Sequence, residues 1–551
     1  MGSKDKIIVL GLDGASPDLI FPWIKEGKLP AFKLLTERGI YGSLRSTIPP
    51  VTGAAWPSFM TGKNPGKHGT FDFVRYNPLA YDGWKEQAIV TSDLFAGTTF
   101  FDLLSYLGYT MGVITVPVTY PVWDVNGFMI AGYPCPDTNK NYICSRWKDL
   151  EIEGRLNFHA DYYKCTPEDQ ILADGLSMME KRTRLALKAM EQFQLDCLIM
   201  VLGAIDRAQH DFWKYHDPEY KHRHPEKNDQ YRDAIFRHYQ KADWALQELM
   251  KKMDDRSTLF VLSDHGGGSH PSTYFQLTRW LGDRGFLTYK TSKSYVYKRL
   301  RSLKKKLEKL VFKGHRTIRT PMAVQNKFSY IERVDWKKTK AFVYPMQFPA
   351  AGIVINVAGR QSSGVVKPGG EYEELRSHII EQLLDLVDPQ TNVKVVSHAF
   401  RREDIYHGEH VQHAPDVVFL TNEGYEAFQD PNKELEHLFS PVDEDILDRF
   451  SGLHRMQGIF FAYGKQFREG KEVHDLSIVD VAPTILYSMK VAIPHDMDGH
   501  VPLIMFKDSY TESQTIQYRD PLPGKASGVS ILSAEEEASV KEKLKGLGYI
   551  R

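Results

Sequence analysis

The sequence predicts a layered α/β fold built around a mostly parallel sheet. Short apolar runs, typical of strands buried on both faces, alternate along the chain with amphipathic helical stretches. An aspartate follows closely after three of these runs, at Asp13, Asp206 and Asp264. Since ligands gather at the carboxyl ends of strands in such sheets, we expect these three acids to share one site.

The first half of the chain supplies most of the predicted core. The expected strands are Lys6–Leu12, Tyr41–Thr47, Met111–Val116, Cys197–Leu202 and Thr258–Ser263. Helices are expected between them, with apolar residues near the helical period, over Pro30–Arg38 (closed by Gly39), Leu176–Phe193 and Tyr231–Met253.

The second half predicts a smaller sheet region and a return to the core. Its expected strands are Ala341–Tyr344, Gly352–Asn356, Lys394–Ser397 and Asp416–Leu420, followed by a buried strand at Gly458–Tyr463. A capping box at Ser533 to Glu536 precedes a helix that ends at Gly546. We expect a catalytic core at 1–284 and 450–515, a helical insertion at 285–340, a smaller α/β subregion of the same domain at 341–449, and a C-terminal helical tail at 516–551.

The composition limits the classes of binding partner and the cellular compartments that we expect for this protein. The 551 residues contain 70 Lys+Arg and 70 Asp+Glu, so overall charge gives no reason to expect a specific nucleic-acid partner. No apolar run approaches the roughly 18 residues that a membrane span needs, and no signal peptide opens the chain. The 4 cysteines show no CxxC spacing, which favours reduced thiols. We expect a cytoplasmic protein, and the sequence leaves its oligomeric state open.

A strongly basic stretch lies at 295–319. Its leucines recur at steps of three and four, which predicts an amphipathic helix with a basic outer face. One interpretation is a solvated surface helix packed on the main body. The other is an interfacial or lid helix that makes peripheral contact with anionic surfaces.

Ser46–Gly69 is the stretch around which the chemistry is organised. Two prolines lead to Thr52, which precedes Gly53, Ala54 and Ala55 and is interpreted as the N-cap of a helix. Free N–H groups and the positive dipole end favour an anion there. A hydroxyl nucleophile that attacks a phosphoryl group would be placed at such a position, although an isolated threonine is more often a plain cap.

Three further clusters change that balance. Asp206 and His210 stand at i and i+4, so they share one face of a helical turn. Asp264 and His265 follow a strand and precede three glycines, where backbone can approach a bound ion or phosphate. His454 lies just ahead of the last core strand. Together with Asp13 and Thr52 they form a nitrogen and oxygen donor set that suits two divalent ions.

These motifs resemble those of the alkaline phosphatase superfamily, in its type I phosphodiesterase/nucleotide pyrophosphatase-like branch. In order along residues 6–505 they are G-L-D-G, P-V-T-G with T-G-K-N-P-G-K-H-G, D-R-A-Q-H, S-D-H-G, G-L-H-R, and V-D-V-A-P-T-I-L with D-M-D-G. The resemblance implies a three-layer α/β/α sandwich and fits best the prokaryotic "phosphohydrolase or phosphomutase" group.

The resemblance also implies roles for individual residues. One metal would be held by Asp206, His210 and His454. The second would be held by Asp13, Asp264, His265 and the Thr52 oxygen. The ions would be zinc, with manganese as the second choice, and a small phosphorylated substrate would be hydrolysed through a phosphothreonine on Thr52.

Several activities remain open at this stage. Phe73 falls where the nucleotide pyrophosphatases offer an asparagine to a phosphate oxygen, which argues against that activity. A threonine nucleophile leans towards phosphodiesters. The alternatives are a phosphomonoesterase, a phosphonate hydrolase and a phosphomutase of the same superfamily. A sulfatase is disfavoured because the chain lacks the C/S-x-P-x-R motif. Outside the enzymes, a degenerate binder of phosphorylated ligands is the remaining interpretation.

Overall fold

A nine-stranded sheet forms the centre of the computed structural model, which describes residues 4–75, 77–82, 88–136, 143–145, 166–218, 229–290, 330–433, 435, 437–523 and 532–546. The strand order is β22-β2-β21-β9-β1-β8-β5-β6-β7. The strands are β1 (Lys6–Leu12), β2 (Ile40–Arg45), β5 (Met111–Val116), β6 (Gly127–Ala131), β7 (Ile143–Ser145), β8 (Cys197–Leu202), β9 (Ser257–Leu262), β21 (Gln457–Tyr463) and β22 (Lys471–Ser477). Only the pairings made by β21 and β7 are antiparallel.

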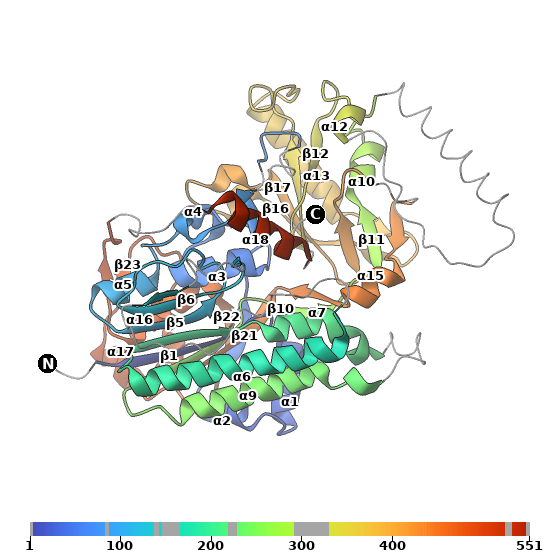
Figure 1. Cartoon of the computed structure of the whole chain (residues 1–551). Helices are drawn as coiled ribbons and strands as arrows, with labels where there is room; N and C mark the ends of the chain where they lie inside the picture. Colours follow the sequence, from blue (N-terminus) through green and yellow to red (C-terminus); the bar gives the residue numbers. More distant parts are fainter. Residues whose placement is uncertain are drawn as a thin grey trace.

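Helices cover both faces of this sheet, so the predicted α/β/α sandwich is confirmed (Figure 1). One face carries α1 (Pro17–Lys25), α2 (Pro30–Arg38), α6 (Glu168–Gln192), α7 (Ala204–His216) and α9 (Ala234–Met250). The other carries α3 (Thr52–Thr61), α5 (Phe100–Tyr106), α16 (Val481–Ser488) and α18 (Ala534–Gly546). Strand β1 shows why the layers form: Ile7 and Val9 join the core on one face, and Ile8 and Leu10 join the core on the other.

A second, smaller sheet lies at the top of Figure 1, beyond the α3 side of the main sheet. Its strand order is β12-β13-β17-β16, with the strands at β12 (Ala341–Tyr344), β13 (Ala350–Ile355), β16 (Val396–Arg401) and β17 (Val417–Thr421). Helices α10 (Leu277–Asp283) and α13 (Gly370–Leu384) pack on it around a core of its own. Three short strands, β11 (Thr273–Gln276), β18 (Tyr425–Phe428) and β19 (Phe439–Pro441), form a separate sheet.

The predicted elements differ from the structure mainly at their ends. Helix α6 begins at Glu168 rather than Leu176. Its first turn is polar, so the hydrophobic pattern does not show where the helix starts. Glu168 and Asp169 in that turn favour a helix start, because acids stabilise the positive end of the helix dipole. Helix α9 begins at Ala234, after a 3₁₀ turn at Asp229–Tyr231. The strand expected at Lys394–Ser397 is two strands, β15 (Val393–Lys394) and β16.

Some predictions find a direct counterpart and others fall outside the described residues. The capping box at α18 is present, since Glu536 N donates to Ser533 Oγ at 3.2 Å and Ser533 N donates to Glu536 Oε2 at 2.8 Å. Cys135 and Cys197 are buried free thiols. No helix in the described part of the chain is long and apolar enough to cross a membrane. The basic stretch 295–319 lies outside the described residues. The domain boundaries stay a prediction.

Asp243 links two helices that cover the sheet, and this contact yields a test. Its Oδ1 accepts hydrogen bonds from Ala31 N at 2.9 Å and Phe32 N at 3.0 Å, so a side chain of α9 caps the start of α2. Removing the acceptor in Asp243→Ala should lower the free energy of unfolding by about 1–3 kcal/mol. Asp243→Asn, which keeps an acceptor oxygen, should cost less. Denaturant unfolding measures both.

The pH dependence of this contact has a defined sign. Burial raises the pKa of Asp243 from 3.8 to about 6. A carboxyl with a raised pKa in the folded state contributes most stability below its unfolded pKa and loses it as the pH rises through the folded pKa. The stability of the wild type relative to Asp243→Asn should therefore fall between pH 3.8 and about 6. A difference that stays flat or rises over this interval would contradict the assignment.

Candidate active site

Thr52 is the first residue of α3, a helix in which every residue is buried. The predicted N-cap role is wrong: the cap is Val51, whose backbone is extended, and no side-chain cap bond forms at this helix start. Thr52 is the first helical residue. Its Oγ1 points instead toward Asp13 Oδ1, at 3.3 Å, and His265 Nε2, at 3.2 Å.

Asp13 and Asp264 come together because their strands are neighbours. Strands β1 and β9 are parallel and paired, so the residues that follow them meet at one edge of the sheet. His265 Nε2 lies 3.7 Å from Asp13 Oδ1 and 3.4 Å from Asp264 Oδ2. One ligand atom from each of the three residues falls within 4.8 Å of the others, which is a grouping that could hold an ion.

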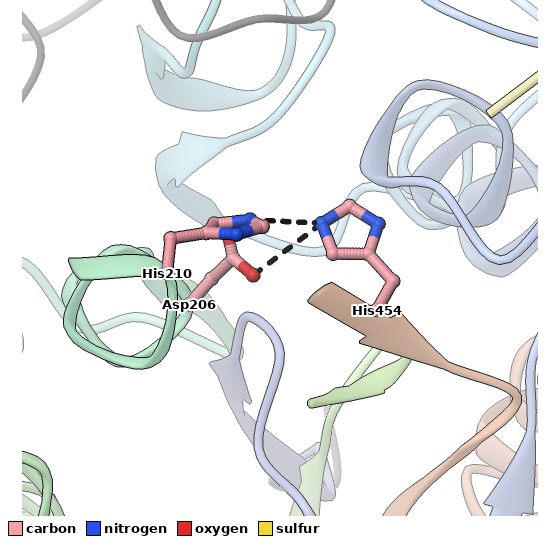
Figure 2. A group of neighbouring side chains, drawn as sticks. All are labelled: Asp206, His210 and His454. Carbon is pink, nitrogen blue, oxygen red and sulfur yellow. Dashed lines mark hydrogen bonds and ion pairs between the residues drawn. The ribbon is translucent and has the colours of Figure 1, made fainter. Parts of the chain in front are cut away.

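A second group joins α7 to the strand β20 (Gly452–Arg455). Asp206 and His210 lie one helical turn apart, as predicted, and Figure 2 shows both facing His454. His210 Nε2 is 3.1 Å from His454 Nε2, and Asp206 Oδ1 is 3.6 Å from His454 Nε2. Among the described residues these are the two groups of at least three acidic, histidine or cysteine side chains able to surround an ion.

Backbone carbonyls orient all three histidines. The Nδ1 atoms of His210, His265 and His454 lie 2.6, 3.0 and 3.0 Å from the carbonyl oxygens of Gly452, Gly266 and Pro50. A carbonyl oxygen only accepts, so each Nδ1 donates and each neutral Nε2 is left with a lone pair. This is the arrangement that fixes imidazoles as metal ligands.

The electrostatics of the two groups favour the binding of cations. Burial, with Asp264 and Asp206 nearby, raises the pKa of Asp13 well above its ordinary value, and burial raises the pKa of Asp264 to about 8. Burial and the neighbouring His265 lower the pKa of His454. Asp264 Oδ2 is buried and accepts no hydrogen bond. A divalent ion would neutralise the acids and fill the gap between the facing Nε2 lone pairs, so the residues present fit two such ions.

Gly14 explains how the two groups can sit so close. It follows Asp13 with a φ of +72°, and a Cβ there would lie 2.8 Å from Asp206 Oδ1. Glycine is therefore required both for the backbone conformation and for the approach of α7 to the end of β1.

The three glycines after His265 have a packing role that the sequence did not indicate. They form β10 (Gly266–Ser269), which pairs with β20 and sets Gly267 opposite His454. A Cβ on Gly267 would lie 2.7 Å from the Gln209 side chain, and one on Gly268 would lie 2.5 Å from Arg455. These glycines therefore make room for the protein's own chain, and the expected approach of their backbone to a bound ion or phosphate stays a prediction.

Several residues that support the site were not found from the sequence. Trp56 Nε1 donates to Asp13 Oδ2 at 3.0 Å, and Gly14 N donates to Asp264 Oδ1 at 3.2 Å. Trp56 carries the pattern of an ordinary core aromatic within a helix, so no local signal marks it. The carbonyls of Pro50 and Gly452 are likewise set by tertiary structure alone.

Comparison with known proteins identifies the family. A sequence model of the type I phosphodiesterase/nucleotide pyrophosphatase family matches residues 7–445. The chain belongs to this family. Its members hydrolyse phosphoric esters with the help of metal ions, so this family member is a phosphoesterase. A search of curated proteins finds no match.

Two solved structures illustrate the similarity to known proteins. A phosphonoacetate hydrolase from Sinorhizobium meliloti 1021, in complex with phosphonoacetate, has 15% identity and a TM-score of 0.51, with 89% of this chain and 96% of the other covered. Murine ectonucleotide pyrophosphatase/phosphodiesterase 5, in complex with AMP, has 13% identity and a TM-score of 0.49, with 90% and 98% covered. The first of these supports the alkaline-phosphatase-like fold.

Metal analysis tests the two groups separately. Purified protein should contain close to two divalent ions per chain. Asp206→Ala or His454→Ala should empty mainly one position, and Asp264→Ala or His265→Ala mainly the other, because each removes a donor from one group. Elemental analysis and chelator titration provide the measurement.

A buried histidine outside both groups serves as the control. His270 Nδ1 donates to Pro271 O at 2.8 Å, so His270→Ala removes an imidazole without touching either group and should retain both ions. Active protein with no bound metal and no response to chelators would contradict the assignment.

Proposed function

We propose that this protein is a two-metal phosphodiesterase that works through a covalent phosphothreonine on Thr52. The observation that carries the proposal is the position of Thr52 Oγ1. It lies at the first residue of α3, within 3.3 Å of Asp13 and 3.2 Å of His265, rather than in a capping bond. A hydroxyl held between candidate metal ligands at the positive end of a helix is placed to act as a nucleophile.

The two groups of donors would hold the ions. Asp206, His210 and His454 would hold one, and Asp13, Asp264, His265 and the Thr52 oxygen the other. The mixture of imidazole and carboxylate favours zinc, with manganese as the second choice. When bound, the ions supply Lewis acidity, which neutralises charge on the phosphoryl oxygens and lowers the pKa of the nucleophile.

The chain's own residues then position the reaction. Asp13 and His265 orient Thr52 Oγ1, which gives its proton to solvent and attacks phosphorus in line with the leaving group. The phosphorus–oxygen bond to the leaving alcohol breaks, and the alkoxide takes up a proton. Water then attacks the phosphothreonine, the bond between Oγ1 and phosphorus breaks, and the Thr52 hydroxyl is restored.

Replacing Thr52 separates a structural role from a catalytic one. No cap bond is lost in Thr52→Ala, so the variant should stay folded and keep most of its metal. Turnover should fall by several orders of magnitude, each tenfold being about 1.4 kcal/mol of barrier. Thr52→Ser, which keeps the hydroxyl, should retain measurable activity. Acid trapping of the wild type with substrate should add a phosphoryl-containing mass to the peptide that bears Thr52. Near wild-type turnover by Thr52→Ala would rule out the covalent mechanism.

A substrate panel tests the preference for diesters. Nitrophenyl diesters should be hydrolysed faster than the matching phosphate monoester, phosphonate and sulfate ester, because a threonine nucleophile in this family favours diesters. Each substrate is measured with zinc and with manganese, so that the metal preference is read in the same experiment. A faster reaction with the monoester or the phosphonate would assign the protein to that activity instead.

A further inference from the structure

A pocket of about 210 Å³ is lined by Pro49 and by part of the segment 69–78, which precede and follow α3 in the chain. Three segments far apart in the sequence form its walls, with Pro49, Gly69, Phe71, Asp72, Val74, Arg75, Asn77 and Pro78 from one region, Tyr344, Pro345 and Met346 from the second, and His413, Ala414 and Pro415 from the third. Most of these side chains are apolar. The pocket therefore suits an organic group rather than a bare phosphate.

Backbone packing places this pocket beside Thr52. A Cβ on Gly53 would lie 2.6 Å from Phe73 N and 2.8 Å from the Asp72 carbonyl carbon, so the start of α3 rests directly on the segment that carries Asp72. Pro49 lines the pocket, and the next residue, Pro50, accepts the hydrogen bond of His454. Two stretches of backbone, Pro49 to Thr52 and the contact of Gly53 with Asp72, therefore connect the pocket to the start of α3.

Asp72 is the acidic side chain of this pocket, and it is only 4% exposed. Gln347 Nε2 donates to its Oδ2 at 3.3 Å, and Phe73 N donates to its Oδ1 at 2.7 Å. In the described part of the chain no lysine, arginine or histidine forms an ion pair with it. Burial consequently raises the pKa of Asp72 from 3.8 to about 7.

Two cationic side chains, Arg75 and His413, also line the pocket. Arg75 and His413 are exposed and face solvent, and the pKa of His413 is lowered by burial and by nearby positive charge that includes Arg75. Burial and the nearby charge of Asp72 raise the pKa of Tyr344. No cationic side chain lowers the pKa of Asp72. The buried part of the lining is thus mainly apolar and partly aromatic, and its one carboxyl group, Asp72, forms no ion pair.

We propose that this pocket receives one alcohol substituent of the phosphodiester and that Asp72 selects substituents with an ammonium group. The inference rests on the proposed diesterase function and specifies its substrate class. A buried carboxylate without a partner is costly, and a cationic ligand group removes that cost. The rings of Phe71 and Tyr344 add a favourable surface for a quaternary ammonium. A carboxylate on the substituent would be repelled.

Three esters that share a p-nitrophenyl leaving group test the proposal. They are p-nitrophenyl phosphorylcholine, its uncharged isostere p-nitrophenyl 3,3-dimethylbutyl phosphate, and p-nitrophenyl 2-carboxyethyl phosphate. For the wild type, kcat/KM should be at least about tenfold higher for the choline ester than for the isostere, and lowest for the carboxylate ester, since tenfold corresponds to about 1.4 kcal/mol of charge interaction. Asp72→Asn should abolish the choline preference and leave the rate with the uncharged isostere within about twofold.

Two controls separate charge from structure. Asn77→Ala changes an exposed residue of the same pocket and should leave the choline preference intact. Metal content should be unchanged in both variants. Equal rates for the choline ester and its isostere in the wild type, or a preference that survives Asp72→Asn, would overturn the inference.

Binding keeps this test independent of turnover. The three esters are also titrated calorimetrically into metal-loaded Thr52→Ala protein, where the same affinity order should appear. If no ester is hydrolysed by the wild type, the diesterase proposal fails. The affinity order still decides the role of Asp72, because a tighter choline ester that loses its advantage in Thr52→Ala/Asp72→Asn supports the pocket, whereas equal affinities refute it.

Discussion

The burial of like charges at one sheet edge is the constraint on which the rest of the site depends. Asp13 and Asp264 leave neighbouring strands at the same level, and Asp206 approaches them across Gly14. Each acid is at most 9% exposed, and the raised pKa values of Asp13 and Asp264 record the cost of bringing them together. The other groups of the site are arranged around these acids: the Nε2 atoms of three imidazoles, the Trp56 N–H and the Thr52 hydroxyl all lie beside them.

Sequence alone anticipated the parts of the molecule that local pattern controls. Strands β1, β5 and β8 were predicted with the bounds that the structure shows, because a strand buried on both faces is a continuous apolar run that ends abruptly. The acids at strand ends and the Asp206–His210 pair were found for the same reason, since strand termini and helical periodicity are short-range features. Their grouping follows from the parallel pairing of the sheet.

Long-range contacts account for what the sequence did not show. The sequence predicts that the Thr52 hydroxyl caps its own helix. In the structure it contacts Asp13 and His265 instead, which lie 39 and 213 residues away in the chain. The contact between Gln347 and Asp72 joins positions 275 residues apart. Neither residue stands in a recognisable motif, so their meeting depends on how the smaller sheet is placed over the larger one. The glycines of β10 show the same limit, because their neighbours come from α7 and β20.

The ribbon formed by β10 and β20 has a consequence for how the site assembles. It begins directly after His265, pairs Gly267 with His454, and stacks the two imidazole rings with centroids 3.9 Å apart. One of these histidines belongs to each candidate metal-binding group, so ordering one ring also restricts the other. Loading of the first ion would remove conformational freedom that the second would otherwise have to lose. The two positions should therefore be coupled, so that a variant that empties one of them also binds the remaining ion less tightly.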